Sequence, residues 1–309
     1  MDISAEVINL IDEIRNDRVH GASYLARQAA EVIKIATEHS QVGTPEEFLV
    51  EQKEIGRRLM SARPAMAPVS NVVSRLLNTI AAKSKGMDLE SISKLTASVA
   101  DEIIKDSQRA TVQIAQYGTQ LINDGDTIMT HSYSATVMAV LKKAFSRHGN
   151  IEVTVTRSGS GRTGEIIAQE LGPCGIPITF IDDAAMGLYV STVNKVMVGA
   201  DRVCADGKIV NGIGTYQLAL ASKQANIPFY VVCDTLKFDP RLRGNEVDLE
   251  EKEPSEVVEP TRLPPGVRIR NPYFDITPPE LVSGIVTENG LFTAEEVIAY
   301  LKGQSAEQV

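Results

Sequence analysis

Tryptophan is absent from this 309-residue chain, and aromatic residues make up only 5% of it. Proteins that bind single-stranded nucleic acids stack the bases on aromatic side chains. The net charge of -9 also provides no general basic surface for a phosphate backbone. The composition therefore excludes a general nucleic-acid-binding protein, although a small phosphorylated ligand or a protein partner stays compatible with it.

Long apolar runs, cysteine and histidine are also scarce. The apolar run at 176–181 is short and contains Thr179, so no segment is long enough to span a bilayer. Three cysteines (Cys174, Cys204 and Cys233) are too few for a disulfide framework, and the four histidines lack metal-site spacing. The acidic N-terminal segment lacks an apolar signal region. We therefore expect a cytoplasmic protein with reduced thiols, no membrane association and no metal.

The first 120 or so residues have the periodicity of amphipathic helices. Between 22 and 36 the apolar residues recur on one helical face, and similar patterns cover 69–80 and 89–122. Thr44 followed by Pro45 and Glu46 is typical of a helix start, with a capping hydroxyl, a proline and an acid in the first turn. The pattern predicts an all-helical domain over 1–123.

The pattern changes near Gly125. Short β-branched runs then alternate with helix-like segments, which is typical of a mostly parallel sheet covered by helices. The predicted strands are 127–130, 151–155, 177–181, 195–198 and 229–232, and the predicted helices are 135–147, 164–171, 184–190, 214–224 and 293–301. The sequence therefore predicts a two-domain α/β protein, with a Rossmann-like α/β domain over 124–309.

The stretch 236–265 interrupts this alternation because it is rich in glutamate and proline. A solvated loop is the main interpretation of such a composition. The alternative is an acidic arm that binds a partner.

Polar residues follow every predicted strand. Ligands bind beyond the carboxyl ends of parallel strands, so these positions are candidate site residues. They are listed in chain order: His131-Ser132, Thr156-Arg157-Ser158, Asp182-Asp183, Asp201-Arg202 and Cys233-Asp234. Asp201 stands out, because a carboxylate directly behind an apolar strand is partly desolvated and can act in acid–base chemistry. The alternative roles for Asp201 are capping a turn or pairing with Arg202.

Two glycine-containing turns are candidate anion sites. The segment 156–164 contains glycines, hydroxyls and the arginines Arg157 and Arg162, between a predicted strand and a predicted helix. The segment 211–215 also precedes a predicted helix. Neither turn matches a known nucleotide-binding motif, and a plain turn is the alternative for each. A Ser-His-Asp triad of Ser132, His131 and Asp201 is disfavoured, because adjacent residues rarely face each other.

Three segments together resemble one superfamily. They are 126–134 (DTIMTHSYS), 199–240 (beginning GADRVCADGKIVNGIGTYQ) and 271–290 (NPYFDITPPELVSGIVTENG). The superfamily contains methylthioribose-1-phosphate isomerase, archaeal ribose-1,5-bisphosphate isomerase, and the α, β and δ regulatory subunits of eukaryotic initiation factor 2B. The resemblance covers nearly the whole chain and supports the same two-domain fold.

The isomerase branch implies roles for particular residues. Its catalytic aspartate corresponds to Asp201, and its catalytic cysteine corresponds to Ser132, with His131 as another acid beside it. Its phosphate and sugar contacts correspond to the following residues: His20, Gly21, Ala22, Ser23, Arg63, Ser134, Ala135, Thr136, Asn211, Gly212 and Lys237. Arg157 and Ser158 in the glycine-containing turn complete the set of candidate binding residues.

The sequence departs from the isomerase pattern at four places. Ser132 replaces the cysteine, His20 stands where an arginine is usual, Gly212 where a lysine is usual, and the segment beginning Arg157-Ser158 replaces Glu-Ser/Thr-Arg-Pro. These departures favour the regulatory branch, whereas Asp201 favours the isomerases.

We therefore expect an aldose–ketose isomerase that converts a C1-phosphorylated pentose, of the ribose-1,5-bisphosphate to ribulose-1,5-bisphosphate type. The site is expected between the two domains. The resemblance implies no redox cofactor or metal, and it implies a homo-oligomer, either a dimer or a hexamer built of dimers. The alternative is a non-catalytic subunit like those of initiation factor 2B, which binds a sugar phosphate or nucleotide and contacts a translation factor.

Overall fold

The computed structural model describes residues 3–17, 19–159 and 161–307. The chain forms two compact units, Met1–Ala110 and Thr111–Val309. The division falls inside the long helix α5 (Leu89–Thr119), earlier than the predicted boundary at 123. The reason is packing, since Ile114 and Ile122 belong to the hydrophobic core of the second unit.

The first unit is entirely helical, as predicted. Its helices are α1 (Ala5–Asn16), α2 (Ala22–His39), α3 (Pro45–Ala62), α4 (Ala67–Lys83) and most of α5. Thr44 caps α3, because its hydroxyl accepts a hydrogen bond from the Glu47 amide (3.2 Å) and Pro45 opens the helix. Helix α1 was not predicted from the sequence, and it buries Val7, Ile11 and Ile14.

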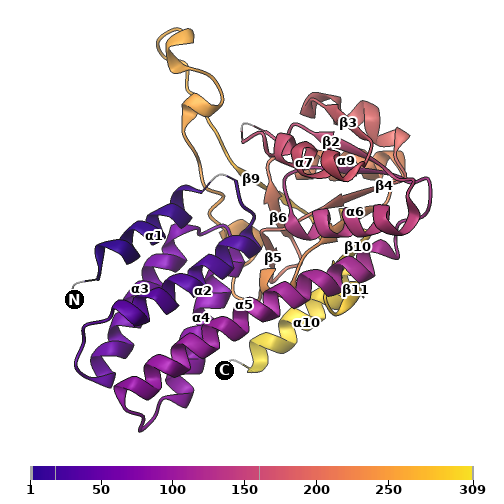
Figure 1. The fold of residues 1–309 in the computed structure, drawn as a ribbon. Coiled ribbons are helices and arrows are strands. Elements are labelled where there is room, and N and C mark those ends of the chain that lie inside the picture. The colour runs from indigo at the N-terminus through magenta and orange to yellow at the C-terminus, as the bar shows by residue number, and fades with distance from the viewer. Residues whose placement is uncertain (1–2, 18, 160, 308–309) are drawn as a thin grey trace. The chain divides into compact units, whose positions relative to one another are not determined.

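The second unit is built on a seven-stranded sheet with the order β11-β10-β7-β4-β1-β2-β3 (Figure 1). Its strands are β1 (Thr127–Thr130), β2 (Glu152–Thr156), β3 (Ile178–Ile181), β4 (Lys195–Val198), β7 (Phe229–Val232), β10 (Gly284–Thr287) and β11 (Gly290–Phe292). All neighbouring strands are parallel except β10 and β11. The five predicted strands are confirmed to within one residue at each end.

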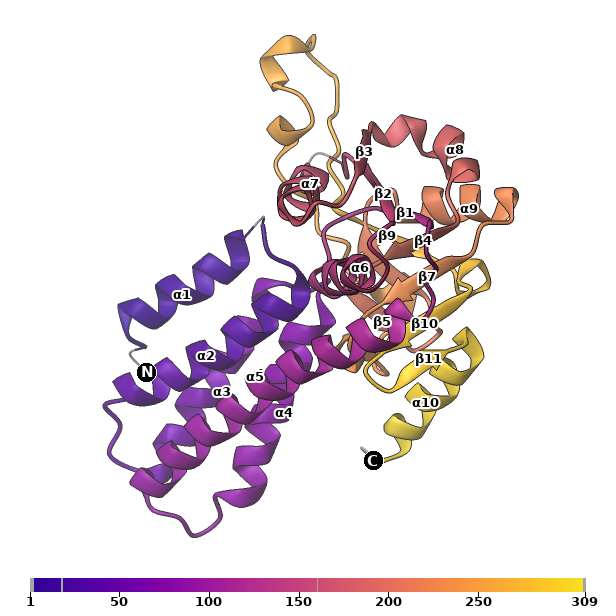
Figure 2. The ribbon, with the colours of Figure 1, turned by 45° about the vertical axis from the view of Figure 1, so that its right-hand side comes forward.

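Helices cover both faces of this sheet, so the predicted α/β fold is correct. They are α6 (Ala135–His148), α7 (Thr163–Leu171), α8 (Met186–Tyr189), α9 (Thr215–Ala225) and α10 (Ala294–Glu307). Alternate residues of a strand point to opposite faces. On β1, Ile128 joins the core under α6 and α7, whereas Met129 joins the core under α8 and α9. Figure 2 shows α6 and α7 on one side of these strands and α8 and α9 on the other.

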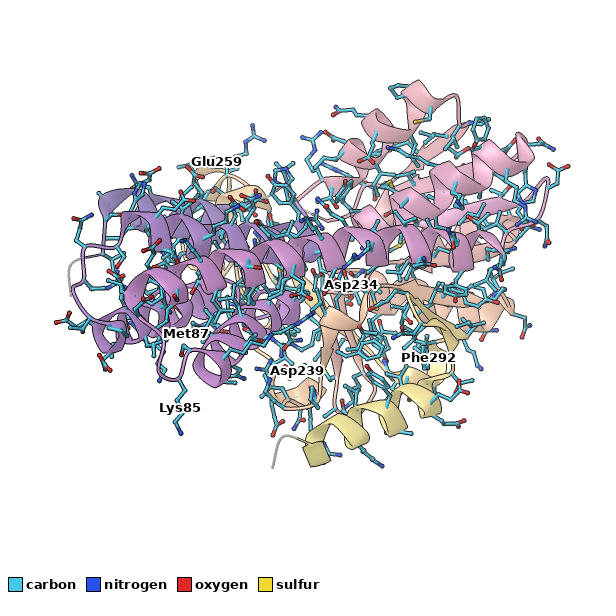
Figure 3. The ribbon with its side chains drawn as sticks, turned by 60° about the horizontal axis from the view of Figure 1, so that its bottom comes forward. Lys85, Met87, Asp234, Asp239, Glu259 and Phe292 are labelled. Atoms are coloured by element: carbon cyan, nitrogen blue, oxygen red, sulfur yellow. The ribbon has the colours of Figure 1, made fainter. Side chains whose placement is uncertain are left out.

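A second sheet was not predicted. It has four short strands in the order β8-β5-β6-β9: β5 (Arg202–Cys204), β6 (Ile209–Gly212), β8 (Phe238–Asp239) and β9 (Phe274–Thr277). Inside it, the Arg202 guanidinium forms a buried ion pair with Asp239, which Figure 3 labels. The chain enters this sheet directly after β4, so the sheet brings Asn211 and Gly212 to the end of that strand.

The segment between β8 and β9 extends away from both sheets of this unit (Figure 1). It contains only short turns, η5 (Gly244–Glu246), η6 (Pro254–Glu256) and η7 (Pro260–Arg262), and most of its side chains are exposed or half-exposed. The interpretation as a solvated loop is right for this part. It is wrong for the beginning of the predicted stretch, where Lys237 and Phe238 are buried.

Candidate functional site

The carboxyl ends of β1 and β4 meet where the strand order changes direction. From β1 the chain proceeds to β2 and β3 on one side, whereas β4, β7 and β10 follow on the other. A crevice opens at such a switch point in parallel sheets, and ligands bind there. His131 and Ser132 follow β1, and Gly199, Ala200 and Asp201 follow β4.

Gly199 lets two predicted binding residues approach each other. A Cβ atom at this position would lie 2.6 Å from Ser134 Cβ and 3.8 Å from Asn211 Oδ1. A side chain here would therefore collide with Ser134. The amide nitrogen of Asn211 donates a hydrogen bond to Thr215 Oγ1 (2.9 Å), which leaves the amide oxygen on the side of Gly199.

Asp201 lies at the start of the hairpin formed by β5 and β6. Its N–H donates to the carbonyl of Val210 (2.8 Å), and the register of the hairpin places it opposite Asn211. The residue is half-buried. The structure thus brings Ser134, Gly199, Asp201 and Asn211 to one place in the second unit.

Ser132 lies on the other side of the crevice. Its backbone φ is 63°, in the left-handed region that few residues other than glycine adopt, and its N–H donates to Ser158 Oγ (2.8 Å). A Cβ atom at Gly212 would lie 2.5 Å from Ser132 Oγ. Gly212 therefore makes room for the Ser132 hydroxyl, so two departures from the isomerase pattern are in direct contact.

His131 is completely buried, and both ring nitrogens are engaged. Nε2 lies 2.7 Å from the carbonyl oxygen of Ile213, so it carries the proton and donates it. Nδ1 lies 2.7 Å from Thr156 Oγ1, whose hydroxyl donates to the neutral ring. Burial lowers the pKa of His131, against smaller opposing effects of the Ile213 carbonyl and Asp183. These surroundings fit a residue that positions its neighbours and do not support the predicted role of His131 in catalysis.

The glycine-containing turn at 156–164 is already bonded to a carboxylate of the chain. The N–H groups of Ser158 and Gly159 donate to the two oxygens of Asp183 (2.8 and 2.7 Å). Arg157 is exposed, with a guanidinium nitrogen 3.8 Å from Asp182, and Ser160 lies outside the described residues. These two backbone amides therefore already have an acceptor in Asp183, and the binding role of Arg157 and Ser158 stays a prediction.

A carboxylate also accepts hydrogen bonds from the backbone N–H groups at the N-terminus of α9. Asp275 on β9 accepts from Gly214 N (2.7 Å) and Tyr216 N (3.1 Å). Burial raises the pKa of Asp275 to about 6, although the two N–H donors partly oppose the shift. The sequence analysis did not single out this residue. The sequence signal that could have identified Asp275 is an acidic residue near a strand end within the segment 271–290.

The N-terminus of α6 differs from the turn at 156–164 and from the N-terminus of α9. Ser134 caps the helix, its hydroxyl lies 2.9 Å from Thr136 Oγ1, and Thr136 in turn donates to the Val232 carbonyl (2.8 Å). In the described part of the chain, no carboxylate accepts from the first turn of this 14-residue helix. Helix N-termini bind phosphate through their free N–H groups and the helix dipole. Lys237 is buried in the turn η4 (Thr235–Lys237) that follows β7.

The other predicted residues belong to the helical unit, where the structure brings them together. His20 stacks on Tyr24 at 3.9 Å and its Nδ1 lies 2.8 Å from Asp17 Oδ2. Arg63 is buried at the end of α3 and donates to the Asp17 carbonyl (3.1 Å). Gly21 is the cap of α2, whose first residues are Ala22 and Ser23. These groups surround the N-terminus of α2.

Within 3–17, 19–159 and 161–307, no three His, Cys, Asp or Glu side chains gather as metal ligands. In the same residues, no helix has the length and apolar character needed to cross a membrane. Cys204 and Cys233 are buried, and burial raises the pKa of both thiols, that of Cys204 to about 12. Both are therefore small core residues, which is the usual role of a buried free cysteine.

A helical unit followed by a Rossmann-like unit is the fold of a known group of proteins. The sequence matches the initiation factor 2 subunit family (IF-2B) over residues 18–294, and the chain belongs to this family. It is 35% identical to a ribose 1,5-bisphosphate isomerase of Pyrococcus furiosus, over 97% of this chain and 94% of the relative.

Two solved structures have the same fold. The translation initiation factor eIF-2B of Pyrococcus horikoshii OT3 superposes with a TM-score of 0.83 at 33% identity, over 96% of this chain and 99% of the other. The 5-methylthioribose 1-phosphate isomerase of the same organism gives a TM-score of 0.79 at 26% identity, over 96% and 87%. The resemblance stated from the sequence is confirmed, and the family contains both enzymes and translation factors.

Proposed function

We propose that this protein is an aldose–ketose isomerase that converts ribose 1,5-bisphosphate to ribulose 1,5-bisphosphate. The observation that carries the proposal is Asp201, a half-buried carboxylate at the switch point, in a chain 35% identical over 97% of its length to an enzyme of that name. A carboxylate in such a place can donate and accept protons.

The substrate explains the need for an acid. Its C1 phosphate prevents spontaneous opening of the ring to a free aldehyde, so the enzyme must break the bond between C1 and the ring oxygen. Asp201 gives a proton to the ring oxygen as this bond breaks. The hydrogen on C2 moves to C1, and the C2 hydroxyl returns a proton to Asp201 as it becomes a ketone. Hydrogen moves within one molecule, so the reaction itself requires no redox cofactor.

The remaining residues bind and orient the sugar in this proposal. Ser134, Ala135 and Thr136 at the N-terminus of α6, with Lys237, hold one phosphate. Asn211, Gly212 and Ser132 contact the sugar hydroxyls. An alkoxyl proton is hard to remove, so Ser132 acts through hydrogen bonds and does not replace a thiolate. The resemblance also implies phosphate contacts in the helical unit, at the following residues: His20, Gly21, Ala22, Ser23 and Arg63.

The direct experiment incubates the purified protein with ribose 1,5-bisphosphate and measures ribulose 1,5-bisphosphate. Asp201→Asn should lower kcat by about 10²- to 10⁴-fold, which is the contribution of a general acid–base residue. Asp124→Asn is the control, because it removes an exposed carboxylate that precedes β1 and should leave kcat unchanged. Absence of turnover in the wild-type protein, or full turnover in Asp201→Asn, would overturn the proposal.

A second candidate is a regulatory subunit like those of initiation factor 2B. The TM-score of 0.83 to a structure named translation initiation factor eIF-2B favours it, as does Ser132 at the position of the isomerase cysteine. Affinity capture on the full chain would identify a translation factor as partner. Capture of such a factor together with no turnover would select this function, and turnover without capture would select the isomerase.

Under either function we propose a cytoplasmic homo-oligomer, a dimer or a hexamer built of dimers. Sedimentation at micromolar concentration should give a mass at least twice the 33.5 kDa of the chain. A monomer at that concentration would contradict this proposal.

A further inference from the structure

The segment 212–216 joins β6 to α9 and forms the wall beside Ser132. It contains Gly212 and Gly214, so few side chains of its own hold it in place. Gly214 is the cap residue of α9, with a φ of 106°, and it has no side-chain oxygen to accept the N–H groups of the first turn. The shape of this wall therefore depends on groups from other elements.

Strand β9 provides these groups on one side. Asp275 accepts from the N–H of Gly214 (2.7 Å) and of Tyr216 (3.1 Å), so it supplies from a distant strand the acceptor that a capping side chain normally provides. The carbonyl of Tyr273 accepts from Ile213 N (2.9 Å). Three backbone N–H groups of the segment thus donate to β9 or to the residue directly before it.

His131 holds the segment from the other side. Its Nε2 donates to the Ile213 carbonyl (2.7 Å), and a Cβ atom at position 214 would lie 2.8 Å from the ring. Next to this contact, Gly212 faces the Ser132 hydroxyl. A small cavity of about 40 Å³ lies here, with Ser132, Ser158, Gly212 and Tyr273 among its lining residues.

We infer that Asp275 is a positioning residue of the site. By bonding Gly214 and Tyr216 to β9, it fixes the backbone of Gly212 against Ser132 and keeps Asn211 beside Gly199. Asp275 itself does not contact the substrate. The kinetic part of this inference rests on the proposed isomerase function, whereas the structural part does not.

Two variants of Asp275 and one control test the kinetic part. Asp275→Ala removes both acceptors and should lower kcat/KM by about 10- to 100-fold, mostly through a higher KM, because a displaced wall binds the sugar less well. Asp275→Asn keeps one oxygen acceptor and should recover part of this loss. Asp88→Ala removes a carboxylate that accepts from the Ser91 amide (2.8 Å) at the start of α5, and it should keep wild-type kcat and KM.

Wild-type kcat and KM in Asp275→Ala would overturn the inference, as would an equal loss in Asp88→Ala. If Asp275→Ala does not fold, the comparison of Asp275→Asn with the wild type decides in the same way. Asp201→Asn should differ from all of these, because its loss falls on kcat.

Hydrogen exchange tests the structural part without any substrate. The amides of Gly214 and Tyr216 should exchange faster in Asp275→Ala than in the wild type, with an intermediate rate in Asp275→Asn and no change in Asp88→Ala. Unchanged exchange in Asp275→Ala would overturn the positioning role. If the wild-type protein shows no turnover, the proposed function fails, and the exchange rates still decide whether Asp275 positions this segment.

Discussion

The polar groups on the two sides of the crevice differ in how deeply they are buried. On the β1 side, His131, Thr156 and Ser158 are buried and bonded to one another, and Asp183 accepts the nearby backbone amides. On the β4 side, Asp201 is half-buried beside a glycine-lined approach. Buried polar groups must be bonded inside the protein, so a complete network has no acceptor or donor left for a substrate.

This difference separates residues that hold the site from residues that react in it. Histidine and serine on the β1 side are residue types that a sequence suggests for catalysis. Their partners assign them to the framework that keeps Ser132 in its left-handed conformation. The reacting group is therefore expected on the β4 side, where Asp201 lies.

The largest effect that tests this comparison is expected from His131→Phe. The phenyl ring cannot donate to the Ile213 carbonyl or accept from Thr156, so two buried groups lose a partner. At about 1 to 3 kcal/mol for each group, the free energy of unfolding should fall by about 2 to 6 kcal/mol. Urea denaturation measures it. Asp201→Asn should cost less stability because Asp201 is only half-buried. A loss as large as that of His131→Phe would remove the distinction between the two sides.

The next effect concerns pH and Asp275, which has a pKa of about 6 in the folded protein against an ordinary 3.8. The raised pKa means that the fold favours the protonated form. The stability from this group is therefore complete below pH 3.8 and is lost as the pH rises to about 6. The loss reaches up to about 3 kcal/mol, from 1.36 kcal/mol for each pKa unit.

Asp275→Asn removes this titration while keeping the size of the side chain. The difference in unfolding free energy between wild type and variant should therefore shift in favour of the variant between pH 4 and pH 7. Urea denaturation at several pH values gives this difference, in which the other carboxylates cancel. A difference that is constant with pH would show that Asp275 does not titrate in this range.

The two sides also show what a sequence can reveal. The five parallel strands were predictable because strands covered on both faces are continuous apolar runs, as in Val196, Met197 and Val198. The second sheet was not, because its strands have two to four residues and include Arg202 and Asn211. Its pairing depends on contacts between distant segments.

Asp201 lies just after β4 because residues that follow a strand stay near its end, and the site roles of Asp201 and Asn211 stay predictions. The two carboxylates that accept backbone N–H groups, Asp183 and Asp275, could not be predicted from the sequence. Asp183 bonds an amide 25 residues away, and Asp275 one 61 residues away. An acid that binds backbone N–H groups of the chain cannot be distinguished by residue type from one that binds substrate.

Asp183→Asn tests the closed turn on the β1 side with a smaller effect. The neutral amide keeps one oxygen acceptor, so one of the Ser158 and Gly159 N–H groups loses its partner. The free energy of unfolding should fall by about 2 kcal/mol. Asp182→Asn changes the neighbouring exposed carboxylate and should stay within about 0.5 kcal/mol of the wild type. Equal stability of the two variants would mean that the turn does not need Asp183.

The smallest effect is expected at Ser132, whose φ of 63° strains every residue except glycine. Ser132→Gly relieves this strain and should raise the free energy of unfolding by up to about 1 kcal/mol relative to Ser132→Ala, although glycine loses more backbone entropy on folding. Both variants lack the hydroxyl, so both should lose the same share of kcat/KM. Because stability and turnover then change independently, Ser132 would combine the strained geometry of the β1 side with a hydroxyl that serves the substrate. A Ser132→Gly variant that is less stable than Ser132→Ala would show that the left-handed conformation is not strained.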